Sequence, residues 1–506
     1  QQNIFIGDNA GGGSWTTAAS NSNVAIGATA MSAALNGALG NTAIGHDGLK
    51  AVTTGDYNTT LGRGAGTAIT TTSSTVAIGN YALSAITSTG DYTIAIGAGA
   101  MGGATIGDGN IAIGYQSMQN ANASGFHRNT AVGYQTMANV GSNSADDNTA
   151  LGYQALYSVT TGDDNVAIGS NALRLATTAG DNISIGHDSM ATRTSGSNNI
   201  AIGPEALYTS KGSTYNIAIG PFAGYNITTG GSGNVFLGYK AGYANQTQGS
   251  AIAIGYEAMG GDAGTQEASG IAIGFRAMFE VKDGSGGVAI GGSTLNYLVG
   301  QYSLGIGNEA GRYATGSFNT FVGFFAGKGA SSAPYSSGER NTAVGYKALQ
   351  DFTTGEHNVA IGYEAAESIT TGNYNTVVGY NAYQGATGGS ETVSVGYQAG
   401  AVAQGGESVL IGYQAGYGTS GGSGANGSWN VAIGKQALMS QRTGARRNVA
   451  IGYRSLYRLL DNGEDSVAIG YESGLYATGS YNTFVGKDSG KGGTNTLPYS
   501  SGQYNV

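Results

Sequence analysis

Short apolar segments return along the whole chain at a nearly constant spacing. Each is three residues long and ends in a glycine, as in Val166-Ala167-Ile168-Gly169, and 28 copies are present. Successive glycines are 16 to 22 residues apart, most often 17. Such self-similarity is the signature of a solenoid, whose units bury apolar side chains only against their neighbours. The pattern predicts an all-β, parallel β-solenoid of about 28 coils, with residues 1–506 as one continuous repeat region.

The three residues before this glycine, here called the repeat glycine, predict a strand that is apolar on both faces. The residue three before it is β-branched in 27 copies, the residue one before it is aliphatic in all 28, and Ala lies between them in 18. The Ala face fits inside a thin coil, so the Val/Ile face points outward. An uncovered apolar stripe of this length exceeds what soluble monomers expose. We therefore expect copies of the chain to associate through this face, at residues such as Val166, Ile168, Val359 and Ile361.

The segment after the repeat glycine alternates small and large apolar residues. The third residue is Ala, Ser, Thr or Gly, and the fourth is Leu or Met in 16 copies. This alternation predicts a second strand, with Leu and the Met residues, such as Met118, in the core. A turn rich in Thr, Gly, Asp and Asn follows. Four residues before the repeat glycine, 19 copies have Asn, which predicts a side-chain amide ladder between coils.

The motif spanning Asn165 to Leu173 resembles the head repeats of YadA-like trimeric autotransporter adhesins, and similar repeats occur in bacteriophage tail fibres. The resemblance covers essentially the whole chain. It implies a left-handed β-roll and a homotrimer with the Val/Ile face at the three-fold axis. The period is longer here than in the adhesin heads, and no coiled-coil stalk, anchor barrel or self-cleaving chaperone is recognisable. A nine-coil block is duplicated at an offset of 163 residues, ending near residues 323 and 486.

Composition restricts the classes of function. The net charge of −9 disfavours nucleic acid and anionic membranes as partners. Cys is absent, which excludes disulfides and catalytic thiols, and no apolar run is long enough to insert into a membrane as a helix. The chain begins at Gln1 and ends at Val506, within a repeat, so we expect a processed product or a segment of a longer protein.

Motifs that carry chemistry are scarce. The sequence from Gly486 to Lys491 has the wrong spacing for a phosphate loop, and the glycine strings open no helix. His46 and His187 follow repeat glycines, where Tyr is usual, and are predicted to be outer-face variants of that Tyr. The turn carboxylates, such as Asp146 and Asp163, fit calcium binding or, more simply, main-chain capping. We expect no enzyme activity, no cofactor and no resident metal.

Two residue groups leave a structural and a binding interpretation open. Tyr directly follows the repeat glycine in 12 copies, and these rings could stack on sugars or on one another. Arg442, Arg446 and Arg447 could hold an anionic glycan or pair with the acidic residues Asp461, Glu464 and Asp465 one coil on. The structural interpretation is favoured in both cases.

Ligand contacts, if this segment makes them, are expected on the enlarged turns. The intervals Gly323–Gly345 and Gly412–Gly434 are 22 residues long. The exposed contacts predicted on or beside such turns are Trp15, Trp429, Tyr335 and Tyr499, with Arg442, Arg446 and Arg447.

These patterns predict a non-enzymatic, extracellular fibre or filament segment with a structural and adhesive role. The segment would associate with itself and bind a glycan or another host-surface ligand. The alternative is the shaft of a bacteriophage tail fibre, on a virion. A monomeric ligand-binding or ice-binding solenoid is the alternative of another class. It would need a flat exposed Thr array, and the Thr pairs occur in turns of varying length.

Overall fold

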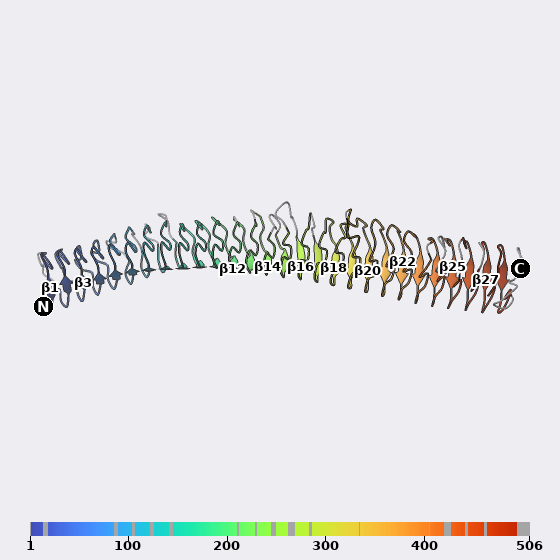
Figure 1. The fold of residues 1–506 in the computed structure, drawn as a ribbon. Coiled ribbons are helices and arrows are strands. Elements are labelled where there is room, and N and C mark those ends of the chain that lie inside the picture. Colours follow the sequence, from blue (N-terminus) through green and yellow to red (C-terminus); the bar gives the residue numbers. More distant parts are fainter. Residues whose placement is uncertain are drawn as a thin grey trace. The chain divides into compact units, whose positions relative to one another are not determined.

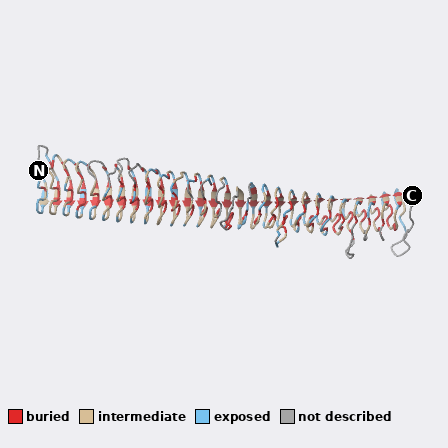
Figure 2. Ribbon diagram, turned by 90° about the horizontal axis from the view of Figure 1, so that it is seen from above, coloured by how far each residue is buried: buried red, intermediate tan, exposed pale blue. Residues whose placement is uncertain are grey.

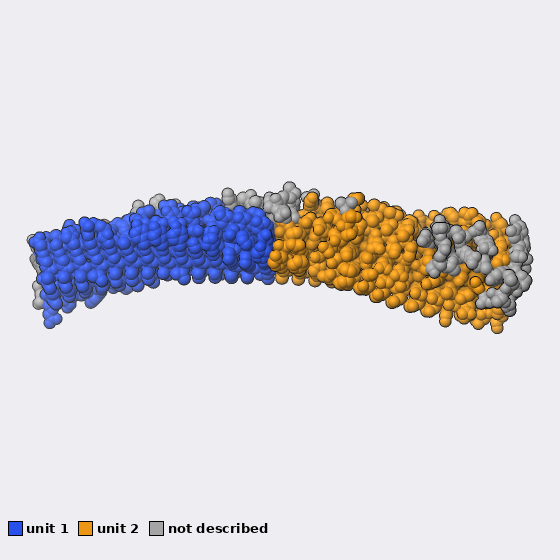
Figure 3. All heavy atoms as spheres, in the orientation of Figure 1, with its two compact units in different colours: residues 1–251 blue, residues 252–506 orange. Residues whose placement is uncertain are grey.

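The chain folds into stacked β-coils in two compact units, residues 1–251 and 252–506 (Figures 1 and 3). This computed structural model describes the chain except residues 1, 14–18, 86–89, 104–106, 122–125, 141–144, 210–211, 228–229, 244–248, 262–268, 283–285, 333, 404, 419–426, 441–443, 460–462 and 493–506. Its 28 strands are parallel, each directly precedes a repeat glycine, and the described residues contain no helix. The predicted all-β parallel solenoid is confirmed.

The strands of the first unit are β1 (Ile4–Ile6), β2 (Val24–Ile26), β3 (Thr42–Ile44), β4 (Thr59–Leu61), β5 (Val76–Ile78), β6 (Ile94–Ile96), β7 (Ile111–Ile113), β8 (Thr130–Val132), β9 (Thr149–Leu151), β10 (Val166–Ile168), β11 (Ile183–Ile185), β12 (Ile200–Ile202), β13 (Ile217–Ile219) and β14 (Val235–Leu237). Those of the second are β15 (Ile252–Ile254), β16 (Gly270–Ile273), β17 (Gly287–Ile290), β18 (Leu304–Ile306), β19 (Thr320–Val322), β20 (Thr342–Val344), β21 (Val359–Ile361), β22 (Thr376–Val378), β23 (Val393–Val395), β24 (Val409–Ile411), β25 (Val431–Ile433), β26 (Val449–Ile451), β27 (Val467–Ile469) and β28 (Thr483–Val485).

Neighbouring strands pair in exact register, so each column of the repeat lies above itself. Strand β10 pairs with β11 through Val166 and Ile183 and through Ile168 and Ile185. Because strand side chains alternate between faces, the middle residue of every strand points inward and its two neighbours point outward. Figure 2 shows buried positions recurring on each coil. The central Ala167 is fully buried, like most residues of its column.

The repeat glycine is required because successive coils approach closely there. Gly169 has a φ of +133°, and a Cβ atom on it would lie 2.5 Å from the carbonyl oxygen of Gly186 in the next coil. Both the positive φ and the contact exclude a side chain. The sequence shows this glycine in every copy, and its close approach is visible only in the stacked coils.

The predicted asparagine ladder is present. Asn165 Nδ2 donates to Asn148 Oδ1 (3.0 Å) and to the carbonyl oxygen of Ala179 (2.7 Å). The main-chain N–H of Asn165 also donates to Asn148 Oδ1 (3.0 Å). These side chains are fully buried, so each bond satisfies a polar group that would otherwise be unpaired inside the coil.

The segment after the repeat glycine is not the second strand that the alternation predicts. Gln116 and Met118, the second and fourth residues after Gly114, have φ values of +53° and +50°. The N–H of Gln116 bonds to the previous coil, at Ala98 (3.0 Å), and that of Met118 to the next, at Thr136 (2.9 Å). Hydrogen bonds thus join the coils, but left-handed residues at alternate positions prevent an extended strand. The predicted burial of Met118 is confirmed.

Arg193 is a charged residue in the interior of the first unit. Its side chain is fully buried, and its guanidinium donates to the carbonyl oxygen of Ser213. It lies seven residues after its repeat glycine, where Val159 and Ala176 of preceding coils are apolar and buried. Desolvation lowers the pKa of Arg193 to about 10. Because the folded-state pKa is below the unfolded value, burial of the charged guanidinium costs stability throughout the neutral pH range.

We predict that Met118→Lys destabilises the fold and Tyr115→Ala barely does. The lysine buries a charge inside a coil, which costs roughly 3–5 kcal/mol when unpaired. Tyr115 is exposed and loses one stacking contact with Tyr134, worth about 1 kcal/mol. Thermal unfolding of both variants tests this, and equal small shifts would contradict the inward placement of the methionine column.

Arg193→Met should raise the temperature of unfolding. Methionine has a similar length and carries no charge to desolvate, and replacing buried charges by apolar residues is neutral or stabilising by about 1–4 kcal/mol. The control is Arg174→Met on the outer surface, where little change is expected. A clear loss of stability in Arg193→Met would show that the guanidinium contributes more through hydrogen bonds than its burial costs.

Candidate association surface and ligand-binding residues

The outward residues of the strands form an exposed apolar surface, here called the sheet columns. They are the residues three and one before each repeat glycine. Ile361 is 40% exposed and Ile219 is 40% exposed, while Val166, Ile168 and Val359 are half-buried. The outward direction predicted for the Val/Ile face is confirmed, and nothing within the chain covers these four proposed interface residues completely.

The sheet columns are large enough to hold a stable interface. Each unit contains 14 strands with two outward side chains apiece. At the observed exposures they leave on the order of 1,500 Å² of apolar surface per unit, against ~800 Å² per partner in a standard interface. Patches of this size mark contact sites in soluble proteins.

One edge of the sheet columns is bordered by the residue directly after the repeat glycine, here called the post-glycine column. The aromatic rings of this column stack on one another from coil to coil, as the structural interpretation of the Tyr residues predicts. The longest unbroken stack is Phe324, Tyr346, Tyr363, Tyr380, Tyr397 and Tyr413, with centroid distances of 4.9 to 5.7 Å. Since neighbouring rings cover one another's faces, the stack presents mainly ring edges and hydroxyls. Stacking of sugars on these faces is therefore disfavoured.

The other edge is bordered by the residue five before the repeat glycine, here called the corner column. This residue takes a left-handed conformation, as in Tyr57 (φ +56°) and Tyr374 (φ +58°). Its side chains point outward, and Tyr92 is 71% exposed. Aromatic residues at a left-handed position are uncommon. Sequence reasoning missed this column because its residue types vary, although their constant spacing from the glycine was available.

Trp429 belongs to the corner column and not to a projecting turn. It has a φ of +58°, is 49% exposed, and its Nε1 donates to the Glu407 carboxylate in the preceding coil. Trp429 therefore lies beside the enlarged turn at a regular position of the coil, and its predicted role as a ligand contact stays a prediction. Trp15 lies outside the described residues.

Tyr335 does not project from its enlarged turn either. Its ring packs against Tyr297 (4.8 Å) and Tyr313 (5.6 Å), and the adjacent Ser336 is fully buried. Ser336 also pairs with Ala314 in a parallel bridge, so this part of the turn rejoins the coil. Tyr499 lies outside the described residues.

The arginine cluster pairs with acidic residues, as the structural interpretation predicts. Arg446 contacts Glu464 (2.9 Å), and Arg447 contacts both Glu464 (2.7 Å) and Asp465 (2.7 Å). The hydrogen bond from Arg446 holds the pKa of Glu464 below its ordinary value, and that from Arg447 does the same for Asp465. With its charge already paired, this cluster has little capacity left for an anionic ligand. Arg442 and Asp461 lie outside the described residues.

The turn carboxylates accept main-chain hydrogen bonds from neighbouring coils. Asp146 Oδ1 accepts from the N–H of His127 (2.7 Å), and Asp163 Oδ1 from the N–H of Asp146 (2.8 Å). Among the described residues, no three His, Asp or Glu side chains gather as metal ligands would. His46 and His187 are exposed on the outer surface, beside Asp47 and Asp188.

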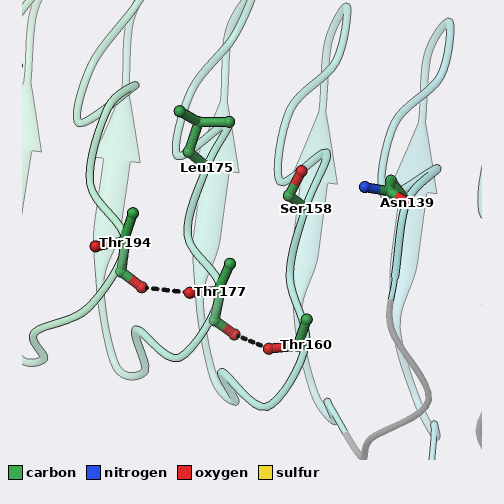
Figure 4. Close-up of a pocket in the computed structure, with 6 residues that line it drawn as sticks. All are labelled: Asn139, Ser158, Thr160, Leu175, Thr177 and Thr194. Carbon is green, nitrogen blue, oxygen red and sulfur yellow. Dashed lines mark hydrogen bonds between the residues drawn. The ribbon is translucent and has the colours of Figure 1, made fainter.

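A shallow groove of about 360 Å³ in the first unit is lined by Asn139, Ser158, Thr160, Leu175, Thr177 and Thr194 (Figure 4). Thr160 Oγ1 donates to the Thr177 carbonyl oxygen (2.7 Å), and Thr177 Oγ1 to that of Thr194 (2.9 Å). These hydroxyl protons are therefore used between coils. The three Thr residues are in register, but the lining has no titratable group that could act as an acid, base or nucleophile.

No helix in the described part of the chain has the length and apolar character needed to cross a membrane. No family model, curated protein or solved structure matches this chain.

Proposed function

We propose that this chain is a non-enzymatic, extracellular structural fibre segment whose copies associate through the sheet columns. The observation that carries the proposal is the outward exposure of Val and Ile side chains on coil after coil. Water contact over this area costs roughly 25 cal/mol per Å², so covering it strongly favours association. The resemblance to adhesin heads supports three copies around a common axis.

A second copy of the chain is the partner that fits this surface. The columns repeat at the spacing of parallel strands, about 4.8 Å. A partner that covers them continuously needs apolar side chains at the same spacing over the same length, and another copy supplies both. An irregular globular partner would match only a few coils.

An adhesive role is proposed for the enlarged turns on the outside of the assembly. Strands β24 and β25 pair in exact register, Val409 with Val431, although their repeat glycines are 22 residues apart. This interval therefore holds five more residues than the usual 17 while the flanking strands keep their register. Loops on rigid scaffolds commonly carry recognition.

Ile361→Asp should weaken or open the assembly and leave the coil folded. The side chain is 40% exposed in a single chain, so a carboxylate there remains hydrated until a partner covers it. Native mass spectrometry and light scattering give the assembly, and circular dichroism gives the fold. Ile361→Val is the matched control and should assemble normally.

The oligomeric state of the unsubstituted chain is the measurement that can contradict the proposed association. If it is a folded monomer at micromolar concentration, the proposed association through the sheet columns is wrong.

Removing residues 421–426, which lie outside the described residues, tests the adhesive role. The shortened interval of 16 residues is a length that other coils of this chain have, such as Gly291–Gly307, so fold and assembly should persist. Attachment to a glycan array or host surface should fall. Attachment equal to that of the full chain would place adhesion elsewhere and leave this segment as a spacer.

A further inference from the structure

The corner and post-glycine columns border the same outward face on opposite edges. Along coil β23, Glu391 and Tyr397 are exposed, the strand residues Val393 and Val395 are half-buried, and Thr392 and Ser394 between them are buried. Each coil therefore presents one corner residue, two sheet residues and one post-glycine residue in that order. Any partner lying on the sheet columns also meets the two borders.

In each coil that has an Arg or Lys on one border, the residue on the other border is aromatic. This holds for every Arg and Lys that either column contains. The corner residue and post-glycine residue of these coils are Tyr57 and Arg63, Arg128 and Tyr134, Arg340 and Tyr346, Trp429 and Lys435, Arg447 and Tyr453, and Tyr481 and Lys487.

The residue composition of the two columns does not explain why cations and aromatic residues occur in the same coils. Only eight of the 28 corner residues are Tyr, Phe or Trp, yet all three Lys or Arg residues of the post-glycine column lie in coils with one of them. Acidic corner residues have hydrogen-bond donors opposite them, for example Asp181 with His187 and Glu391 with Tyr397. No coil carries like charges on both borders.

Contacts within the chain do not account for this match, because none of the described partners of these cations is the residue on the opposite border. Most partners lie one coil away along the stack, and Arg340 also contacts the adjacent Glu339 (3.5 Å). Lys435 lies over the Tyr413 ring at 5.4 Å, and Arg340 lies over Phe318 at 5.5 Å. Arg128 pairs with Asp147 (2.7 Å). The two borders of one coil are six residues apart, up to roughly 20 Å along an extended chain. Two apolar columns separate them.

A cyclic assembly brings the two borders together. When copies are related by rotation about an axis parallel to the stack, equivalent coils lie at the same height. The corner border of one copy then meets the post-glycine border of the next. Same-coil partners on opposite borders then become contacts between copies. A cation is favourable over the face of a corner ring such as Trp429, and it meets the edge and hydroxyl of a stacked post-glycine ring such as Tyr346.

We propose that the corner column of each copy packs against the post-glycine column of its neighbour, coil for coil, and that pairs such as Trp429 with Lys435 set a parallel, in-register assembly. The inference rests on the proposed self-association and adds its orientation and register. The sheet columns supply most of the buried area, but their repeated Val and Ile fit equally well after a shift of one coil. The varied border residues distinguish one register from another.

Cysteine cross-linking tests the register directly, since the chain contains no Cys. The same-coil variant carries Glu391→Cys and Tyr397→Cys. The matched offset variant carries Glu391→Cys and Tyr346→Cys, whose post-glycine position lies three coils earlier, beside β20. A second same-coil variant, Trp429→Cys with Lys435→Cys, guards against a local effect of losing Tyr397 from its stack. Each full-length variant is treated with a short bismaleimide and separated under denaturing conditions.

Both same-coil variants should convert from single chains to covalent multiples, and the offset variant should remain largely single. A link within one chain leaves the product a single chain and is not counted. If native mass spectrometry shows an intact assembly but offset and same-coil variants cross-link equally, the border pairing is wrong and self-association stands. A monomer before cross-linking would instead contradict the proposed function itself.

Discussion

The exact register between parallel strands is the constraint on which the rest of this structure depends. Each residue lies above the residue of the same column in the next coil, so one residue type becomes a continuous stripe. Asn148 and Asn165 show the consequence in the interior, where side-chain amides bond along the stack. The repeat glycine makes this stacking possible, because a Cβ on Gly169 would collide with the carbonyl oxygen of Gly186. Without that close approach, the amide ladder and the aligned strands would lose their spacing.

The columns whose side chains point into the coil and those whose side chains point out of it have different physical roles. The inner Ala, Met and Leu columns fill a narrow space, and buried Asn satisfies the main chain at the corner. The outer Val and Ile columns contribute little to a single chain while they face water. Covering them completely would require a partner, which is why we propose that copies of the chain associate through these columns. Arg193 shows how strict the inner requirement is, since desolvation alone lowers its pKa markedly at an otherwise apolar position.

The aromatic and charged residues of the surface are organised along the stack. Tyr rings such as Tyr363 and Tyr380 cover one another at 4.9 Å, and Arg447 is already paired with Asp465 and Glu464. Groups that look like ligand-binding candidates in the sequence therefore have structural partners. The sheet columns and their borders remain as the surface that repetition makes continuous, and we propose this surface as the site of association.

The sequence by itself determined the solenoid, the position of each strand, the inward Ala and Met columns and the outward Val and Ile columns. A period that stays close to 17 residues in most of the 28 copies leaves little freedom for any other arrangement. Only the tertiary structure decided that the segment around Met118 is left-handed at alternate residues, that Trp429 occupies a regular corner position, and that Tyr335 packs against Tyr297 and Tyr313. A small residue followed by a large apolar one does not distinguish an extended strand from a hydrogen-bonded turn, and in the turn observed here the consecutive residues Ser117 and Met118 are both buried. Contacts between coils depend on which residues the stacking places side by side, and a pattern within one repeat does not contain that information.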